Sequence, residues 1–195
     1  MPPKAKITRD MIINSAFEIA RTQGAESINA RLVAEKLSCS TQPVMYHFSK
    51  IEELKRAVYD KADEFHSAYL MSVADQTGEP MQQIGLQYIR FAAEEKHLFR
   101  FLFQSGAFVG KTLDELITAE ELEPIFAIMQ KIAEVDRKQT VSIFQSVFLV
   151  VHGYASMLAN NAMEYHEDYV VSILERAYIG AIYASKRSGS DEKTI

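Results

Sequence analysis

The sequence predicts an all-α protein of about nine helices, in which a three-helix unit with a helix-turn-helix precedes a larger helical domain. Strand signals are nearly absent, and apolar residues recur at helical spacing along most of the chain. Two short helical patterns, 31–37 and 41–47, flank the break Ser38-Cys39-Ser40. Two helices around a tight turn are typical of a helix-turn-helix.

The first three predicted helices have recognisable ends. Thr8 is a suitable N-cap for the first helix, and Gly24 ends it as a residue that tolerates positive φ. We expect Asn29 to cap the second helix and Ser40 to cap the third, which accepts Pro43 in its first turn. The inward face of the first helix is apolar and comprises Ile12, Ile13, Ala16, Phe17, Ile19 and Ala20.

A long fourth helix is predicted to follow. Ser49 with Glu52 three residues later predicts a capping box, and the helix is expected to run to about Val73. Asp136 and Gln139 predict a second capping box, before a long apolar helix. The later helices are expected over about 81–95, around 98–103, and over 113–133, 137–160 and 167–185.

These patterns predict how the chain is organised. Pro124 is expected to kink or break the helix over 113–133. We expect a DNA-binding domain over 1–50, for reasons given below, a helical domain over 51–186, and a polar, disordered tail over 187–195.

The composition of the chain excludes several classes of protein. Hydrophobic residues make up 48% of the 195 residues, which supports packed cores rather than disorder. The single cysteine, Cys39, excludes an internal disulfide and fits a reducing compartment. We find no apolar run long enough to cross a bilayer and no export leader, so we expect a cytoplasmic protein with no membrane partner.

Charge is unevenly distributed along the chain. The net charge is -5, but residues 1–61 carry more Lys and Arg than Asp and Glu, whereas the rest is acidic. This distribution suits a module that touches phosphate with one end only.

The third predicted helix carries residues suited to DNA. In a helix-turn-helix the second helix enters the major groove, and its first residues meet base edges. Gln42 can bond an adenine edge, and Thr41 or Val44 can touch a thymine methyl. Lys50 lies at a helix start, where its charge and the free amides can share one phosphate. The candidate DNA-binding residues are Arg31, Ser40, Thr41, Gln42, Val44, Tyr46, His47 and Lys50.

At these residues the sequence resembles the tetracycline-repressor (TetR) family of bacterial transcription regulators. The matching residues, at the family's spacing over about 8–54, are Thr8, Ile12, Ala16, Phe17, Gly24, Ile28, Arg31, Val33, Ala34, Leu37, Ser40, Tyr46, His47, Phe48, Lys50 and Leu54. The resemblance implies a three-helix DNA-binding domain followed by an all-helical ligand-binding and dimerisation domain. It also implies that Phe48 and Leu54 are packing residues rather than DNA contacts.

The sequence departs from the family pattern at two positions. Ser38 stands where the family usually has glycine in the turn, and a left-handed serine costs about 1–2 kcal/mol. Pro43 stands near a position where the family often has glycine, which bears on the contacted bases rather than on the fold. Tyr46 and His47 could instead be ordinary core or surface aromatics. We expect Cys39 to be a small buried residue rather than a redox sensor.

The chain after Pro80 has an excess of large apolar residues, among them Tyr88, Phe91, Phe99, Phe101, Phe103, Phe108, Phe126 and Met129. Each taken alone is a core residue, but their number leaves room for an apolar pocket. The resemblance implies such a pocket beside the long fourth helix. We expect a small apolar or aromatic effector, and the candidate ligand-binding residues are Phe65, Tyr69, Tyr88, Phe91, Phe103 and His152.

Two helices, about 137–161 and 167–185, are apolar on more than one side. A helix that is apolar nearly all round is buried, and too few other helices exist to bury both within one subunit. We therefore expect a homodimer with a twofold four-helix interface. The pair His152-Gly153 resembles a subgroup of the family with tryptophan, histidine and glycine here, with Phe148 at the tryptophan position. His152 is equally well explained as a core histidine.

Two other functions are compatible with parts of the sequence. Residues 94–97 supply one Glu-x-x-His motif and 63–66 an imperfect one, whereas a di-metal bundle enzyme needs two such motifs and two further glutamates. No nucleophile elbow, Walker loop or zinc-finger spacing is present, so we expect no catalysis, no metal and no cofactor. The function we expect is that of a repressor, which binds a palindromic operator as a dimer and releases it on binding the effector. An activator, or a DNA-binding protein without an effector, remains an alternative.

Overall fold

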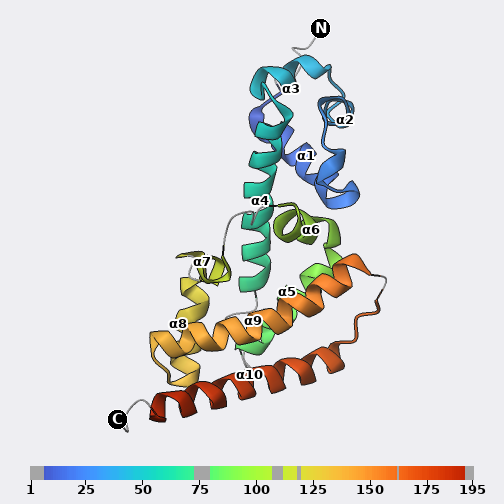
Figure 1. Ribbon diagram of the computed structural model, residues 1–195. Helices are drawn as coiled ribbons and strands as arrows, with labels where there is room; N and C mark the ends of the chain where they lie inside the picture. Colours follow the sequence, from blue (N-terminus) through green and yellow to red (C-terminus); the bar gives the residue numbers. More distant parts are fainter. Residues whose placement is uncertain (1–6, 73–79, 107–111, 118–119, 162, 192–195) are drawn as a thin grey trace. The chain divides into compact units, whose positions relative to one another are not determined.

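The computed structural model describes residues 7–72, 80–106, 112–117, 120–161 and 163–191, and these residues form helices and turns without a strand (Figure 1). The predicted all-α class is therefore confirmed. The elements in order are α1 (Arg9–Gln23), the 3-10 helix η1 (Ala25–Ser27), α2 (Ala30–Lys36), α3 (Thr41–His47), α4 (Ile51–Met71), α5 (Pro80–Glu94), α6 (Lys96–Gln104), α7 (Leu113–Ile117), the 3-10 helix η2 (Glu120–Leu122), α8 (Glu123–Ala133), α9 (Arg137–Asn160) and α10 (Glu167–Asp191).

The chain divides into two compact units. Unit 1 comprises Met1–Ala68 and Glu95–Ala107, and unit 2 comprises Tyr69–Glu94 and Phe108–Ile195. Unit 1 is larger than the domain expected over residues 1–50, because it includes most of α4 and takes α6 from later in the chain. Helix α6 packs on α1, and the Tyr59 hydroxyl of α4 donates to the Leu102 carbonyl of α6 at 3.2 Å.

The helices of unit 1 begin and end largely as their sequences predict. The Thr8 hydroxyl accepts from the Met11 amide at 3.2 Å, and the Asn29 side chain accepts from the Leu32 amide at 2.9 Å. Gly24 ends α1 at a φ of 91°. The fully buried core of this unit includes Ile12, Ala16, Ala20, Val33, Val44, Leu54, Val58, Leu98 and Phe99.

The turn of the helix-turn-helix is built around a left-handed serine. Ser38 has a φ of 52°, as expected for the residue at the family's glycine position. Its amide donates to the Glu35 carbonyl at 3.0 Å, and the Cys39 amide donates to the Ala34 carbonyl at 2.9 Å. These two bonds satisfy carbonyls at the end of α2 and hold the chain in the turn. The Cys39 side chain is half-buried.

The start of α4 differs from the expected capping box. The helix begins at Ile51, and the Ser49 hydroxyl bonds to the Glu53 carboxylate at 3.2 Å rather than pairing with Glu52. The prediction was wrong because it placed the helix start one residue too early. The α4 end expected at Val73 lies outside the described residues.

Unit 2 packs its helices around α9, which contacts α5, α8 and α10. The capping box at the start of α9 is confirmed: the Asp136 carboxylate accepts from the Gln139 amide at 2.8 Å, and the Gln139 side chain accepts from the Asp136 amide at 3.1 Å. The core where α5, α8 and α9 meet contains Ile84, Ile125, Phe126, Met129 and Ile143.

In this unit the structure has the break expected near Pro124, and one prediction was wrong in extent. The helix expected over 113–133 is divided into α7, η2 and α8, and Pro124 lies in the first turn of α8, where its missing amide costs no bond. Helix α10 continues to Asp191, so the tail expected to be disordered is helical to that residue. Residues 192–195, and Phe108 among the expected apolar residues, lie outside the described part of the chain.

Candidate nucleic-acid interface and effector site

Helix α3, the reading helix, presents polar side chains at its start. Ser40 is its N-cap residue in an extended conformation, but the Ser40 hydroxyl makes no capping hydrogen bond, contrary to expectation. Thr41 and Gln42 are exposed on the first turn. Val44 is 0% exposed and belongs to the core of unit 1. The prediction that Val44 touches a thymine methyl was therefore wrong, because helical periodicity turns every third or fourth residue inward.

Each residue of the Tyr46-His47-Phe48 triplet has a different environment. Tyr46 is 83% exposed and stands free of the core. The His47 Nε2 atom lies 3.2 Å from the Ile7 carbonyl oxygen. A carbonyl only accepts, so this nitrogen carries the proton. Phe48 is buried, as the resemblance implies, and its ring lies under the Arg9 guanidinium at 4.8 Å from the centroid.

Two exposed basic residues flank α3 in the sequence. Lys50 is exposed immediately before α4, and Arg31 is exposed in the first turn of α2. Neither makes an ion pair with another described residue. An exposed cation without a carboxylate partner is available to a phosphate. Together with Thr41, Gln42 and Tyr46, these residues form what we call the reading surface.

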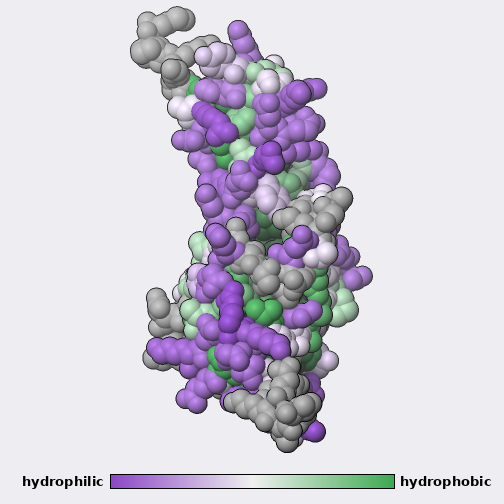
Figure 2. Space-filling model, turned by 60° about the vertical axis from the view of Figure 1, so that its left-hand side comes forward, coloured by the Kyte–Doolittle hydropathy of each residue, from purple (hydrophilic) through white to green (hydrophobic). Residues whose placement is uncertain are grey.

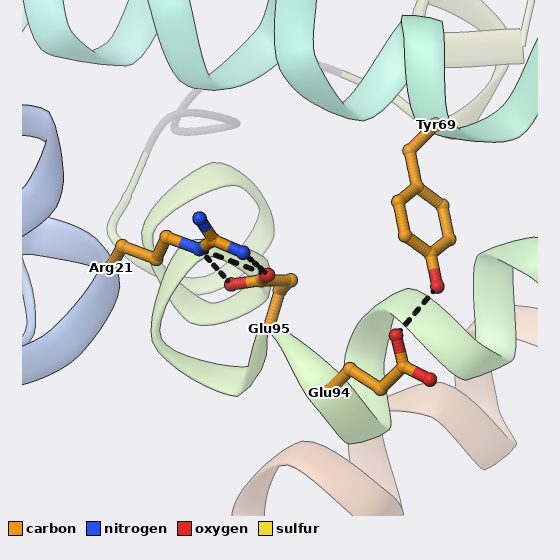
Figure 3. A network of polar contacts seen from close by, with 4 residues as sticks. All are labelled: Arg21, Tyr69, Glu94 and Glu95. Carbon is orange, nitrogen blue, oxygen red and sulfur yellow. Dashed lines mark hydrogen bonds and ion pairs between the residues drawn. The ribbon is translucent and has the colours of Figure 1, made fainter.

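A partly buried ion pair that sequence reasoning missed holds α1 to the start of α6 within unit 1. Arg21 donates from Nε to both Glu95 carboxylate oxygens, at 2.9 and 2.8 Å, and its second nitrogen also bonds to Glu95 (Figure 3). The hydrogen bond to Glu95 raises the pKa of Arg21, against the opposing effect of burial. Nothing in the sequence pairs two residues 74 positions apart.

The six candidate ligand-binding residues fall into both units. Unit 1 contains Phe65, whose ring lies 5.6 Å from that of Phe17, and Phe103, whose ring lies 5.2 Å from His66. Burial lowers the pKa of His66 to about 4. A groove of about 480 Å³ is lined by Asn14, Phe17, Glu18, Arg21, Lys61, Glu64 and Phe65, and a second of about 350 Å³ by Met11, Asn14, Ser15, Glu18, Lys36 and Leu37.

The other four candidates form two contacts within unit 2. The Tyr69 hydroxyl donates to the Glu94 carboxylate at 2.8 Å (Figure 3), and its ring lies 5.4 Å from Phe91. The Tyr88 hydroxyl and the His152 Nδ1 atom are 2.8 Å apart. Burial raises the pKa of Tyr88 and lowers the pKa of His152. A neutral tyrosine and a neutral imidazole are therefore the forms that share this bond.

Three aromatic rings follow one another along α9 beside that bond, and His152 is one of them. The His152 ring stacks on Phe148 at 5.3 Å, and Phe148 stacks on Phe144 at 5.6 Å. All three are half-buried, and the Tyr88 ring meets Phe148 edge-on at 6.1 Å. The four-residue spacing of these rings puts them on one face of α9. Sequence reasoning singled out His152 and Phe148 but not the row, although the spacing was visible.

Helices α9 and α10 leave apolar side chains exposed in the single chain. The exposed large apolar residues on them are Leu149, Val150, Met157, Tyr169, Ile179 and Tyr183. In the lower half of Figure 2, hydrophobic side chains reach the surface between hydrophilic ones. Among the described residues, α9 is long and apolar enough to cross a membrane by length and composition, with 22% of its most apolar window buried. The expectation that no such run exists was wrong.

One residue needed by the di-metal alternative has another partner. The Glu94 carboxylate of the Glu-x-x-His motif accepts a hydrogen bond from the Tyr69 hydroxyl. The part of the chain that the structure describes contains no group of three or more His, Cys, Asp or Glu residues that could hold a metal ion.

Comparison with known proteins places this fold. No protein-family model matches the sequence, and no curated protein matches it. Among solved structures, the chain is similar to a TetR-family transcriptional regulator from Streptomyces coelicolor, with a TM-score of 0.72 and 14% identity over 92% of this chain and 82% of that one.

Two further structures are similar. A TetR-family member from Streptomyces coelicolor A3 gives a TM-score of 0.61 and 17% identity over 87% of this chain and 96% of the other. The multidrug binding protein EbrR, complexed with imidazole, gives a TM-score of 0.58 and 18% identity over 87% of this chain and 88% of the other. The chain thus has the all-helical fold of the TetR-family transcriptional regulators.

Proposed function

We propose that this chain is a cytoplasmic TetR-family transcription regulator that binds double-stranded DNA as a homodimer. The observation that carries the proposal is the reading surface. Thr41 and Gln42 are exposed on the first turn of α3, and the exposed Lys50 and Arg31 flank α3 in the sequence without an ion pair to another described residue. Side chains at the start of such a helix meet base edges, and flanking cations bind phosphates.

A twofold dimer fits the apolar surface of α9 and α10. Exposed apolar residues such as Ile179 and Leu149 would be buried in a twofold interface, in which each copy of the chain contributes the same surface. A dimer also supports a palindromic operator, because two reading helices roughly 34–36 Å apart match half-sites one helical turn apart. We interpret the apolar length of α9 as this interface rather than as a membrane span.

The test of DNA binding starts from random sequence. Purified protein is used to select duplexes from a random library, and the selected duplex is then measured by fluorescence anisotropy. We expect a palindromic site, bound at least about tenfold more weakly by Gln42→Ala, because a good base contact contributes about 1–3 kcal/mol. Lys131→Ala, which removes an exposed charge from α8, is the control. Failure of the wild-type protein to enrich any sequence would refute the proposal.

We further propose that the protein is a repressor released by a small apolar or aromatic molecule. The half-buried rings of Phe144, Phe148 and His152 supply stacking faces, and Tyr88 supplies a buried polar group beside them. Apolar pockets with a few polar groups are the usual sites for small molecules. An effector lowers operator affinity only as far as it prefers the non-binding state.

A screen of neutral and cationic aromatic compounds tests the effector. A compound that raises the melting temperature is expected to release the selected duplex. Tyr88→Phe is expected to weaken that response and leave DNA binding intact, whereas Tyr165→Phe, which removes the hydroxyl of a tyrosine between α9 and α10, is expected to behave as wild type. Equal operator affinity with every bound compound would contradict ligand-controlled release.

A further inference from the structure

Arg9 is held on the aromatic face of Phe48. The guanidinium carbon lies 4.8 Å from the ring centroid, and the ring itself is buried. The Arg9 side chain is exposed, and it makes no ion pair or hydrogen bond with another described residue. A guanidinium stacked on a ring keeps its N–H groups at its edge, where they can form a fork for an anion.

The backbone just before Arg9 is tied to the end of the reading helix. The His47 Nε2–H group donates to the Ile7 carbonyl at 3.2 Å, two residues from Arg9. The ring of Phe48, the next residue after His47, contacts the Arg9 guanidinium. Consecutive residues at the end of α3 therefore hold the start of α1 at two points, one on the backbone and one on the side chain.

The ring that Arg9 contacts belongs to Phe48, which lies two residues after the exposed Tyr46 and two residues before the exposed Lys50 in the sequence. The ring of Tyr46 meets that of His47 edge-on at 5.2 Å. The nearest acidic residue in sequence, Asp10, lies in the first turn of α1, and it makes no ion pair with Arg9. An ordered Arg fork loses little side-chain freedom when it binds a phosphate.

We propose that Arg9 is a DNA-phosphate contact and that His47 is a positioning residue, which holds the Ile7 backbone so that Arg9 remains on Phe48. The proposal rests on the DNA-binding function proposed above. It changes the role expected of His47, whose Nε2 atom serves the protein backbone. Arg9 lies outside the helix-turn-helix and was absent from the candidates drawn from the sequence.

The salt dependence of binding tests the Arg9 contact. Affinity for the selected duplex and for a random-sequence duplex is measured from low to moderate salt. Loss of one phosphate contact lowers the slope of log affinity against log salt by about 0.9. We expect Arg9→Ala to lower the slope by about that amount on both duplexes. Arg9→Lys should keep the slope and bind more weakly than wild type, because lysine keeps the charge but lacks the planar fork.

A double-mutant comparison tests the role of His47. We expect His47→Ala to weaken binding about as much as Arg9→Ala, and to add little when Arg9 is already alanine, since both changes remove one contact. His47→Gln, whose terminal amide can donate to the Ile7 carbonyl, should restore part of the loss. Melting curves of each variant confirm that unit 1 remains folded.

The outcomes separate this inference from the function on which it rests. A wild-type protein that binds no duplex refutes the DNA-binding function. A wild-type protein that binds, with Arg9→Ala showing an unchanged slope, refutes the Arg9 contact alone. Effects of His47→Ala and Arg9→Ala that add fully refute the positioning role. Lys131→Ala should match wild type throughout, since it removes a charge from unit 2.

Discussion

Val44 and Gln42 lie two residues apart on the reading helix, and their side chains have opposite environments. Gln42 is exposed, whereas Val44 is fully buried. We expect Val44→Ala to lower the free energy of unfolding by about 2 kcal/mol, because it removes two buried methyl groups and leaves a cavity. The selected DNA sequence should not change. Urea unfolding measures the first effect, and repeated selection measures the second.

Gln42→Ala should show the reverse pattern. Its unfolding free energy is expected to stay within about 0.5 kcal/mol of wild type, as for most surface changes. The base preference at one position of each half-site should relax. A Val44→Ala protein of normal stability with altered base preference would contradict this assignment of the two residues.

Because the His66 ring is buried, we expect the free energy of unfolding to depend on pH. The ring is 6% exposed, and burial lowers its pKa from an ordinary 6.5 to about 4. Between these values the unfolded chain binds the extra proton and the folded chain does not, so folding loses stability as the pH falls. The free energy of unfolding is therefore not reduced by His66 above pH 6.5, and it is lower by about 3 kcal/mol at pH 4.

The comparison with His66→Leu isolates this effect. Urea unfolding is followed from pH 7.5 to 4.5 for both proteins, because carboxylates in general also titrate toward the acid end and the variant corrects for them. We expect the stability of wild type relative to the variant to fall across this range. A constant difference between the two would show that His66 does not stay neutral in the folded protein.

At the scale of elements, the turn before the reading helix carries local strain. Ser38 is left-handed at a φ of 52°, a conformation that costs a non-glycine residue about 1–2 kcal/mol. We expect Ser38→Gly to raise the free energy of unfolding by about 1 kcal/mol or less, because glycine relieves the strain but gains freedom in the unfolded chain. Thermal or urea unfolding of the two proteins measures it.

A matched site exists in unit 2. Glu134 ends α8 at a φ of 53°, so Glu134→Gly should stabilise by a similar amount. Neither change touches Thr41 or Gln42, and DNA selection should be the same for both variants. Destabilisation by Ser38→Gly would mean that the serine side chain has a role beyond the turn.

For the molecule as a whole, the proposed homodimer rests on the apolar faces of α9 and α10. Ile179 is 66% exposed in the single chain, so Ile179→Glu costs the folded subunit little. We expect the variant to dimerise at least about tenfold more weakly, since a charge at each copy of an interface residue is desolvated without a partner. Sedimentation velocity measures the change, and operator affinity should fall with it.

The control for this change lies on another helix. Ile132 is 45% exposed on α8, and Ile132→Glu should leave the dimer and the operator affinity unchanged. If Ile179→Glu dimerises as tightly as wild type, the α9–α10 surface is not the interface. If wild type is a monomer at micromolar concentration, the twofold model of DNA binding fails as well.

The sequence by itself determined the helices and the turn. Thr8, Asn29 and the Asp136–Gln139 pair act on amides within four residues, so their caps could be predicted from local spacing. The left-handed backbone of Ser38 agrees with the family's usual glycine at that position, a pointer that came from the resemblance rather than from local spacing. Errors fell at helix ends, such as Ile51 and Asp191, where packing or one residue of register decides the boundary.

Only the tertiary structure decided which side chains meet across the chain. Arg21 with Glu95, His47 with Ile7 and Tyr88 with His152 join residues 40 to 74 positions apart. No local period encodes such pairs, because they depend on how separate helices pack. The same packing turned Val44 inward and left Gln42 outward, although both lie on the same short helix. Secondary structure follows from neighbouring residues, whereas contacts across the fold require every helix to be in place.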